Sequence, residues 1–367
     1  MSSFPLLIED SEKVVELPRN SLRNILIICE AMLKSGSTNL NTLKDVLPEI
    51  RTDKVRQPGS DYKFLTRFFD QGKLKDEADA ALYEELMKGI QALCWLVIFS
   101  RSLQYGVGSF KYLVLDGTKW EQGDDTIHLM TLCVLVGEVA VPIWWEDLQK
   151  AGHSSQTERM EMVQAAMQRY QLQGMTLLAD REYIGIDWLT YLKKSGLSFV
   201  IRVKEGIYHE AINAAKGADW ASLKRRAKTK PKGKKVSKRI CLDGLELHYI
   251  ILKNPRPKAD DELIFLLSNL DSPAEAARLY ELRWQIEVCF KHLKSNGFKL
   301  EEMNVKGKEK RHLMMAMVVL AYCLAIREGL IEAYRNEGRW ILDKATGWYY
   351  RAVSIFRMGL SIIRRKA

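Results

Sequence analysis

A stretch of 26 residues, Ser272 to Gly297 (SPAEAARLYELRWQIEVCFKHLKSNG), constrains the fold of this chain more than any other. After Pro273 its interior has no Gly and no further Pro, and it is rich in Ala, Leu, Arg and Glu, which favours a helix. Ser272 is a suitable N-cap, Pro273 suits the first helical position, and Glu275 is spaced to complete a capping box. Gly297 supplies a stop. We therefore expect one long helix over this stretch.

The expected helix has two different faces. At about 100° per residue, four apolar side chains fall together on a face that should be buried: Leu282, Ile286, Cys289 and Leu293. Within an arc of roughly 60° on another face lie a phenol, a guanidinium, a carboxylate and an ammonium: Tyr280, Arg283, Glu287 and Lys294. This polar face is either a solvated surface with ion pairs inside the helix or one edge of a functional site.

Residues 111 to 204 have the pattern of a mixed sheet with covering helices. Three strand-like runs are followed by a helix, a strand, a second helix and a last strand: 111–120, 126–136, 139–148, 157–170, 175–180, 185–196 and 197–204. This order predicts an α/β fold with an RNase H-like core. Asp116 and Asp180 each follow an apolar strand run, at the sheet edge where sites gather in open α/β folds.

An Asp at such a position can also be a turn residue or a helix cap. Four other acidic residues suit that role better, since they lie in polar turns or near helix starts: Asp124, Asp125, Asp147 and Asp187. Asp116 and Asp180 differ because they directly follow Leu-Val-Leu and Leu-Leu-Ala. We therefore take these two as the candidate site residues of the sheet.

The polar helix face resembles a known signature. The spacing Tyr280-x2-Arg283-x3-Glu287-x6-Lys294, within YELRWQIEVCFKHLK, is similar to the YREK motif of bacterial cut-and-paste transposases of the insertion-sequence-four family. DGT at Asp116, DREY at Asp180 and the segment TERMEMV also resemble motifs of that family. One departure is a Gly at position 117, where many relatives have a second Asp. The resemblance covers roughly residues 110 to 300.

The resemblance implies a DDE triad made of Asp116, Asp180 and Glu287. Such carboxylates would hold two Mg²⁺ ions about 3.5–4 Å apart, which neutralise charge on the attacking and leaving oxygens of a phosphodiester. Mn²⁺ is expected to substitute for Mg²⁺. The activity implied is cleavage of transposon ends and their joining to target DNA.

The same resemblance implies the partners and the remaining roles. Arg283 and Lys294 would bind phosphates, and Tyr280 would hydrogen-bond the DNA backbone beside the cleaved bond. The partners would be double-stranded DNA, namely terminal inverted repeats and target DNA, with a homodimer in the DNA complex. Two rival functions stay open, an RNase H-like DNA nuclease without transposition and a catalytically silent DNA-binding descendant.

The charge and composition agree with a nucleic-acid partner. The net charge is +10 and the pI is near 9.1, values that suit DNA or an anionic membrane surface. The longest apolar run, Leu313 to Ile326, has 14 residues, short of the ~20 that a bilayer needs. With no signal peptide at the start and six scattered Cys, we expect a bacterial cytoplasmic protein at the nucleoid, without a membrane or a zinc site.

The domain boundaries follow from these patterns. Residues 109–204 and 269–335 would form the two parts of the core, with a β-rich insertion domain at 205–268 and a basic tail at 336–367. The basic run at 224–239 is either a solvated loop or a segment that tracks phosphates. Residues 1–108 would form a helical domain whose basic residues suit a helix-turn-helix-like reader as well as a plain bundle: Arg51, Lys54, Arg56, Lys63 and Arg67. Its place before the core favours binding of DNA ends.

Overall fold

An eight-stranded mixed sheet runs through the computed structural model, with the strand order β3-β2-β1-β4-β5-β8-β7-β6. The structure describes residues 15, 17–52, 57, 59–102, 110–257, 261–336, 338–342, 344 and 349–366. The strands of the large sheet are β1 (Tyr112–Gln122), β2 (Asp125–Val136), β3 (Val139–Asp147), β4 (Thr176–Ala179), β5 (Ser198–Val203), β6 (Lys235–Leu242), β7 (Leu245–Lys253) and β8 (Leu263–Ser268). A separate two-stranded ribbon contains β9 (Trp340–Leu342) and β10 (Tyr349–Arg351).

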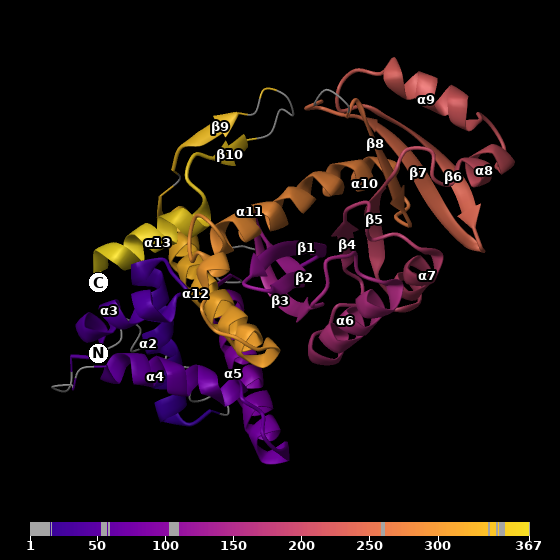
Figure 1. Ribbon diagram of the computed structural model, residues 1–367. Helices are drawn as coiled ribbons and strands as arrows, with labels where there is room; N and C mark the ends of the chain where they lie inside the picture. Colours follow the sequence, from indigo (N-terminus) through magenta and orange to yellow (C-terminus); the bar gives the residue numbers. More distant parts are fainter. Residues whose placement is uncertain are drawn as a thin grey trace.

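The helices surround this sheet and form a bundle beside it (Figure 1). They are α2 (Arg19–Ser35), α3 (Leu40–Ile50), α4 (Ser60–Phe69), α5 (Glu77–Ser102), α6 (Gln156–Arg169), α7 (Ile186–Lys194), α8 (His209–Ala214), α9 (Trp220–Lys228), α10 (Pro273–Tyr280), α11 (Trp284–Leu293), α12 (Lys308–Arg335) and α13 (Ile355–Lys366). Short 3-10 turns are η1 (Asp70–Gly72), η2 (Glu281–Arg283) and η3 (Leu300–Glu302).

The first five strands confirm the RNase H-like core. Strands β1, β2 and β3 form an antiparallel meander, and β4 and β5 then add to β1 in parallel. The parallel connections carry α6 and α7, as crossover connections in a sheet require. In Figure 1 these two helices lie on one side of the sheet, and α10 and α11 lie on the other.

The segment 205–268 continues the same sheet. Strand β8 pairs antiparallel with β5, and β7 and β6 follow outward from it. The turn between β6 and β7 is made by Asp243 and Gly244, both with positive φ, as the Asp-Gly sequence predicts for a tight hairpin. Trp220 of α9 packs against Tyr249 and Phe265, with ring centroids 5.8 and 5.6 Å apart, so it belongs to the core of this extension.

The stretch from Ser272 to Gly297 is not one uninterrupted helix. Ser272 caps α10 by accepting a hydrogen bond from the Glu275 amide, as expected, but the 3-10 turn η2 separates α10 from α11. The second helix ends at Leu293, before Gly297. A Cβ at Gly297 would lie 2.3 Å from the His292 carbonyl oxygen, so this glycine permits close packing of the chain after the helix.

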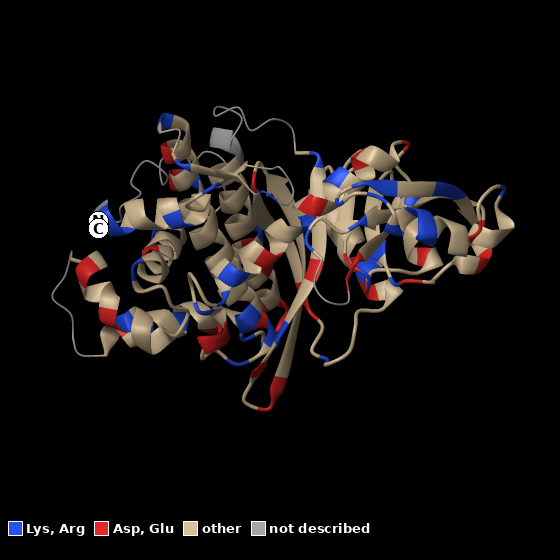
Figure 2. Cartoon of the chain, turned by 90° about the horizontal axis from the view of Figure 1, so that it is seen from above, with Lys and Arg blue, Asp and Glu red and all other residues tan. Residues whose placement is uncertain are grey.

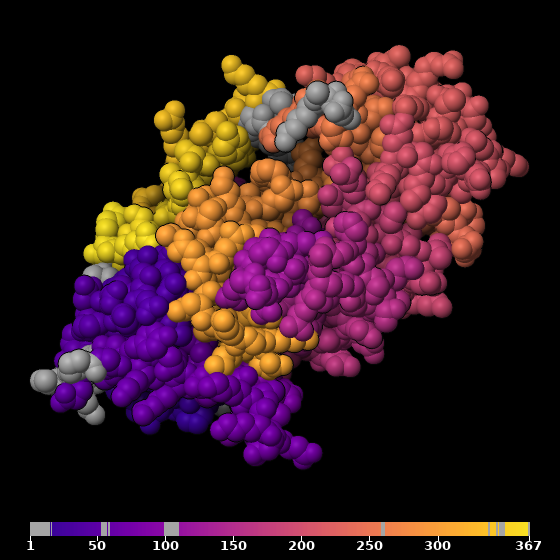
Figure 3. All heavy atoms as spheres, viewed as in Figure 1, coloured from indigo at the N-terminus to yellow at the C-terminus, as the bar shows by residue number. Residues whose placement is uncertain are grey.

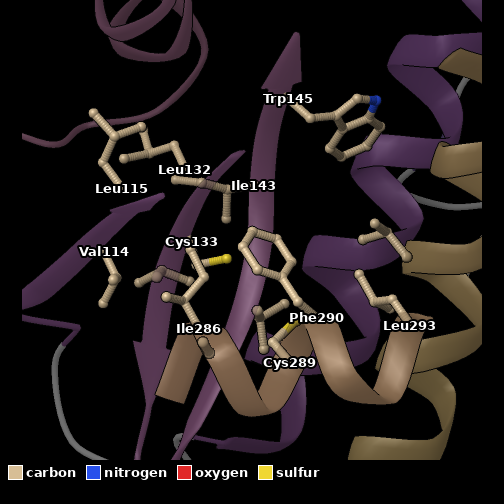
Figure 4. Packing of buried hydrophobic residues seen from close by; sticks show 14 of the residues in the cluster. Val114, Leu115, Leu132, Cys133, Ile143, Trp145, Ile286, Cys289, Phe290 and Leu293 are labelled. Carbon is tan, nitrogen blue, oxygen red and sulfur yellow. The ribbon is translucent and has the colours of Figure 1, made fainter. Parts of the chain in front are cut away.

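The apolar face of this stretch is buried against the sheet, as expected. Ile286, Cys289 and Leu293 are buried, and Leu282 is partly buried. Figure 4 shows α11 directing Ile286, Cys289 and Phe290 toward side chains of β1, β2 and β3. This packing fixes the rotation of α11, and it therefore decides which side chains of the helix face the strand ends.

The helical bundle is built around α12. Helices α2, α5 and α13 pack against it, so segments from both ends of the chain share one core. Within the described residues, α12 is the helix long and apolar enough to cross a membrane, but most of its apolar window is buried inside the protein. Arg51 of the predicted basic set pairs with Asp61, whereas Lys54 and Arg56 lie outside the described residues.

Candidate active site at the ends of β1 and β4

Asp116 and Asp180 lie side by side because of the register of two parallel strands. The pairing of β1 with β4 ends at Leu115 opposite Ala179, and the two aspartates are the next residues of each chain segment. Strand β1 itself does not end at Asp116, since it continues to Gln122 in its pairing with β2. The prediction that the strand ends at Asp116 is therefore wrong for β1 as a whole. Only its parallel pairing with β4 ends there.

Arg283 connects this strand pair to α11. One guanidinium nitrogen donates to Oδ2 of Asp116 at 3.0 Å, and the other terminal nitrogen donates to Oε1 of Glu287. The side chains of Arg283 and Asp116 are only 12% and 18% exposed, whereas Glu287 is 36% exposed. A single guanidinium therefore bridges carboxylates that come from the sheet and from the helix.

Tyr280 completes the contact with the second aspartate. Its hydroxyl donates to Oδ1 of Asp180 at 3.4 Å, and the Arg283 guanidinium lies 5.8 Å from the centre of its ring. Burial raises the pKa of the Tyr280 phenol, so it remains a proton donor at neutral pH. Two of the four residues on the predicted polar face, Tyr280 and Arg283, thus contact the two aspartates, and Glu287 is linked to Asp116 through Arg283.

The site has an excess of negative charge. Burial raises the pKa of Asp116 to about 6, although the Arg283 guanidinium and the Gly117 amide lower it; Asp180 and Glu182 raise it further. Burial disfavours the charged form of Arg283, yet nearby Tyr280, Asp180 and Asp116 raise its pKa overall. One guanidinium does not balance the carboxylates that surround it, and a further cation would be stabilised here.

The donor set fits a hard divalent metal ion. Asp116, Asp180 and Glu287 offer only carboxylate oxygens, which Mg²⁺ and Mn²⁺ prefer. In the present arrangement, no three His, Cys, Asp or Glu side chains among the described residues are close enough to hold one ion together. The Arg283 guanidinium pairs with the carboxylates of Asp116 and Glu287. A bound metal ion would supply the positive charge that Arg283 now supplies to them.

Lys294 lies apart from this cluster, at the C-terminal end of α11. Its ammonium pairs with Glu301 at 2.6 Å, donates to the Lys119 carbonyl at 3.1 Å and lies 5.2 Å from the centre of the Trp120 ring. The side chain is 17% exposed. The structure therefore places the fourth residue of the polar face beside β1, but not on the carboxylates.

Two buried neighbours of the site were not anticipated from the sequence. A Cβ at Gly117 would lie 3.0 Å from Nε2 of His128 and 3.3 Å from the hydroxyl of Tyr183. Both rings are buried, and they occupy the space that a second Asp at position 117 would need. Glu182 also lies near, in contact with His153 at 3.0 Å. Tyr183 and Glu182 belong to the DREY motif. No motif in the sequence marks His128, which the structure places opposite Lys119 in the pairing of β1 with β2.

The fold and the acidic site define a class of proteins, the RNase H-like enzymes that act on nucleic acids with metal ions. Sequence comparison assigns residues 111–324 to the transposase DDE domain. Because the match spans more than half of the chain, the chain belongs to the DDE transposase family. It is thus a divalent-metal-dependent enzyme of DNA transposition, and DNA is its partner.

Two solved structures show distant similarity. A piggyBac transposase, in a synaptic complex with hairpin DNA, aligns at 11% identity with a TM-score of 0.46, over 95% of this chain and 73% of that chain. Endonuclease V from Bacillus subtilis aligns at 13% identity with a TM-score of 0.27, over 58% of this chain and 86% of that chain. No curated protein sequence matches the chain. The fold assignment therefore rests on the strand order, and the family rests on the matched domain.

Proposed function

We propose that the chain is a cut-and-paste transposase of the insertion-sequence-four family, with Tyr280, Arg283, Glu287 and Lys294 as its YREK signature. The observation that carries this proposal is that Tyr280 and Arg283 contact the aspartates that follow the paired part of β1 and β4, and that Arg283 also links Glu287 to Asp116. A solvated helix face with intrahelical ion pairs would not reach two carboxylates of the sheet.

Asp116, Asp180 and Glu287 are the proposed ligands of two Mg²⁺ ions, for which Mn²⁺ can substitute. Bound metal would supply charge neutralisation on the attacking and leaving oxygens of the phosphodiester. Asp116 gives a fixed position, since its side chain is only 18% exposed and accepts a hydrogen bond from the Gly117 amide at 2.8 Å. Glu287 is more exposed than Asp116, which suits a carboxylate that adjusts when DNA arrives.

The cationic side chains of the signature are proposed to bind the DNA backbone. With Asp116 and Glu287 holding metal, Arg283 would be free to turn its planar guanidinium to a phosphate. Tyr280 keeps its hydroxyl at the strand ends and donates to the backbone beside the cleaved bond. Lys294 would reach a phosphate by exchanging its partner Glu301.

The proposed DNA partners are the terminal inverted repeats of a mobile element and its target DNA. The basic segment 224–239 spans the second part of α9, a turn and the first part of β6, and it supports DNA binding because most of its Lys and Arg side chains are exposed. Figure 2 shows Lys and Arg at this end of the molecule, interspersed with Asp and Glu. We further propose that the chain works as a homodimer on DNA in the bacterial cytoplasm. The five domain boundaries and the DNA-end-binding role of residues 1–108 stay part of the proposal.

The test is a cleavage and joining assay on a DNA fragment that carries the inverted repeats flanking the gene. Wild-type protein with Mg²⁺ or Mn²⁺ should cut at the repeat and join the released end to a second DNA. Asp180→Asn should reduce both products by orders of magnitude while the protein still binds the fragment. Cleavage without joining would favour the nuclease, and binding without any metal-dependent cleavage would favour the silent descendant.

A further inference from the structure

The ribbon formed by β9 and β10 exposes aromatic side chains to solvent. Tyr349 and Tyr350 are 63% and 50% exposed, and Trp340 is also exposed. Rings of this size are usually buried on at least one face in a folded protein. Three exposed rings on two short paired strands therefore mark this ribbon as a contact surface.

The segment that carries the ribbon is also basic. From residue 335 to residue 357 the sequence has five Lys or Arg and two acidic residues. Four of these basic residues are exposed: Arg339 and Lys344 beside the ribbon strands, Arg335 at the end of α12 and Arg357 in α13. Aromatic rings interleaved with cations are the combination that binds nucleic acid, because phosphates pair with the cations while bases or sugars pack on the rings.

The position of the ribbon gives it access to DNA at the active site. In Figure 1 the ribbon lies on one side of α10 and α11, and the extension of the sheet lies on the other. The space-filling view in Figure 3 shows the yellow and salmon parts rising on either side of the orange helices. The ribbon and the sheet extension thus flank α11, the helix that carries Glu287.

We propose that the β9–β10 ribbon is a DNA-contacting arm that holds the duplex beside the active site. This inference rests on the proposed function, because it takes DNA as the substrate of the Asp116 site. A two-stranded ribbon is narrow enough to enter a DNA groove. Tyr349 packs against a base or sugar there, since the strand register puts it on the same face of the ribbon as Trp340, and Arg339 pairs with a phosphate.

Charge favours DNA over a second copy of the chain as the occupant. A twofold interface would place the same basic ribbon from each copy together, and like charges would repel. DNA instead pairs a phosphate with each exposed cation. The ribbon is thus assigned to DNA, and the second copy is an outcome that the test can detect.

The test compares binding of a fluorescein-labelled duplex, which carries one inverted repeat from the flank of the gene. Tyr349→Ala should raise the Kd by about fivefold or more, the loss expected from one base stack. Arg339→Gln should lower the slope of log Kd against log salt by about 0.9, the value for one neutralised phosphate. The matched control is Leu82→Ala, which removes an exposed apolar side chain of α5. Thermal melting should be the same for all variants.

Two results would contradict the proposal that the β9–β10 ribbon contacts DNA. One is a Kd and a salt slope for both ribbon variants equal to those of Leu82→Ala. The other is a DNA-free dimer in sedimentation that the ribbon variants dissociate, which would assign the surface to a second copy. If the ribbon proves not to contact DNA, the proposed function still holds as long as the wild type cuts and joins DNA. A wild type that neither binds nor cuts this duplex would overturn both.

Discussion

Arg283 donates a hydrogen bond to Oδ2 of Asp116 over 3.0 Å, and this contact ties the η2 turn to strand β1. The same guanidinium also bonds to Glu287, so an internal cation holds together two carboxylates that lie far apart in the sequence. Without metal, this arrangement compensates part of the repulsion among the acidic groups. If Asp116 and Glu287 hold divalent metal as proposed, Arg283 and the metal would compete for these carboxylates.

This competition predicts that Arg283→Gln lowers the unfolding free energy without metal and increases the stabilisation that metal gives. In EDTA the variant should lose about 3 kcal/mol of unfolding free energy, because a buried carboxylate loses its charged partner. Mg²⁺ should then stabilise the variant more than the wild type, since no guanidinium has to be displaced. Urea unfolding in EDTA and in MgCl₂ measures both effects. The control is Lys88→Gln, which breaks an exposed pair with Glu84 and should change neither. Equal metal stabilisation of variant and wild type would contradict the competition.

The exposed cations of the basic segment 224–239 give a second prediction. Six exposed cations on α9 and the following turn would be replaced by Gln: Arg225, Arg226, Lys228, Lys230, Lys232 and Lys234. If they track phosphates, the salt dependence of DNA binding should flatten by up to about 0.9 for each phosphate that is no longer neutralised. Fluorescence anisotropy over a salt series measures this slope. A salt slope equal to that of the wild type would mean that the segment 224–239 is only a solvated surface.

Lys238 provides the matched control within the same basic run. Its ammonium donates to the carbonyls of Ile212, Ala215 and Ala218 at 2.5, 2.9 and 2.8 Å, so it closes the end of α8 onto β6. Lys238→Gln should therefore lower the melting temperature and leave the salt slope unchanged. The basic run thus contains both a structural lysine and exposed cations.

Much of the candidate site could be predicted because its signals are local. An apolar run followed directly by Asp marks both Asp116 and Asp180, and the helical period places Tyr280, Arg283 and Glu287 on one side. Two parallel strands of a predicted core then bring their ends together. None of these steps needs knowledge of a distant partner.

The parts that could not be predicted depend on contacts between distant segments. The 3-10 turn η2 and the early end of α11 have no composition signal, because Ala, Leu and Glu continue a helix equally well. Lys294 falls on the polar arc, but its partner Glu301 follows a turn that the helical period does not describe. In the same way, the pairing of β8 with β5 joins the extension to the core sheet, and strand patterns do not specify a neighbour.

A third prediction concerns the packing of α12 against α13. A Cβ at Gly359 would lie 1.8 Å from the Ala325 carbonyl oxygen and 2.6 Å from the Gly329 amide nitrogen. Gly359→Ala should therefore force the helices apart and destabilise the protein by about 3 kcal/mol or more. Gly152→Ala is the control, because nothing lies within 4 Å of the added methyl group. Urea unfolding of the two variants measures the difference, and equal stabilities would contradict the close approach.

A fourth prediction concerns pH. Burial lowers the pKa of His312 to about 4, and Lys308 adds to this effect, while Glu309 and Asp147 oppose it. The unfolded chain, with a His pKa near 6.5, binds the proton first, so stability should fall as pH drops from about 6.5 toward 4, by up to about 3 kcal/mol. His312→Gln should lose this part of the pH dependence. Urea unfolding at pH 7.5 and 5 tests it, with the exposed His209→Gln as the control that should keep the wild-type dependence.

The last prediction separates binding from chemistry on α11. Glu287 is proposed to hold metal, so Glu287→Ala should reduce cleavage of the repeat fragment by orders of magnitude. Its DNA binding should survive or become tighter, because a negative charge near phosphate is removed. Lys294 is proposed to hold a phosphate, so Lys294→Ala should weaken binding, and its cleavage defect should be partly rescued at high protein concentration.

The pair of Lys294 with Glu301 sharpens this comparison. Glu301→Gln removes the carboxylate that lies 2.6 Å from the Lys294 ammonium and leaves the lysine in place. If Lys294 has to exchange this partner for a phosphate, Glu301→Gln should strengthen DNA binding, and Lys294→Ala/Glu301→Gln should abolish the gain. Gel shifts and metal-dependent cleavage on one fragment measure all four variants. Near wild-type cleavage by Glu287→Ala would instead make the polar face of α11 a structural ion-pair pattern, and the assignment of its residues to catalysis would fail.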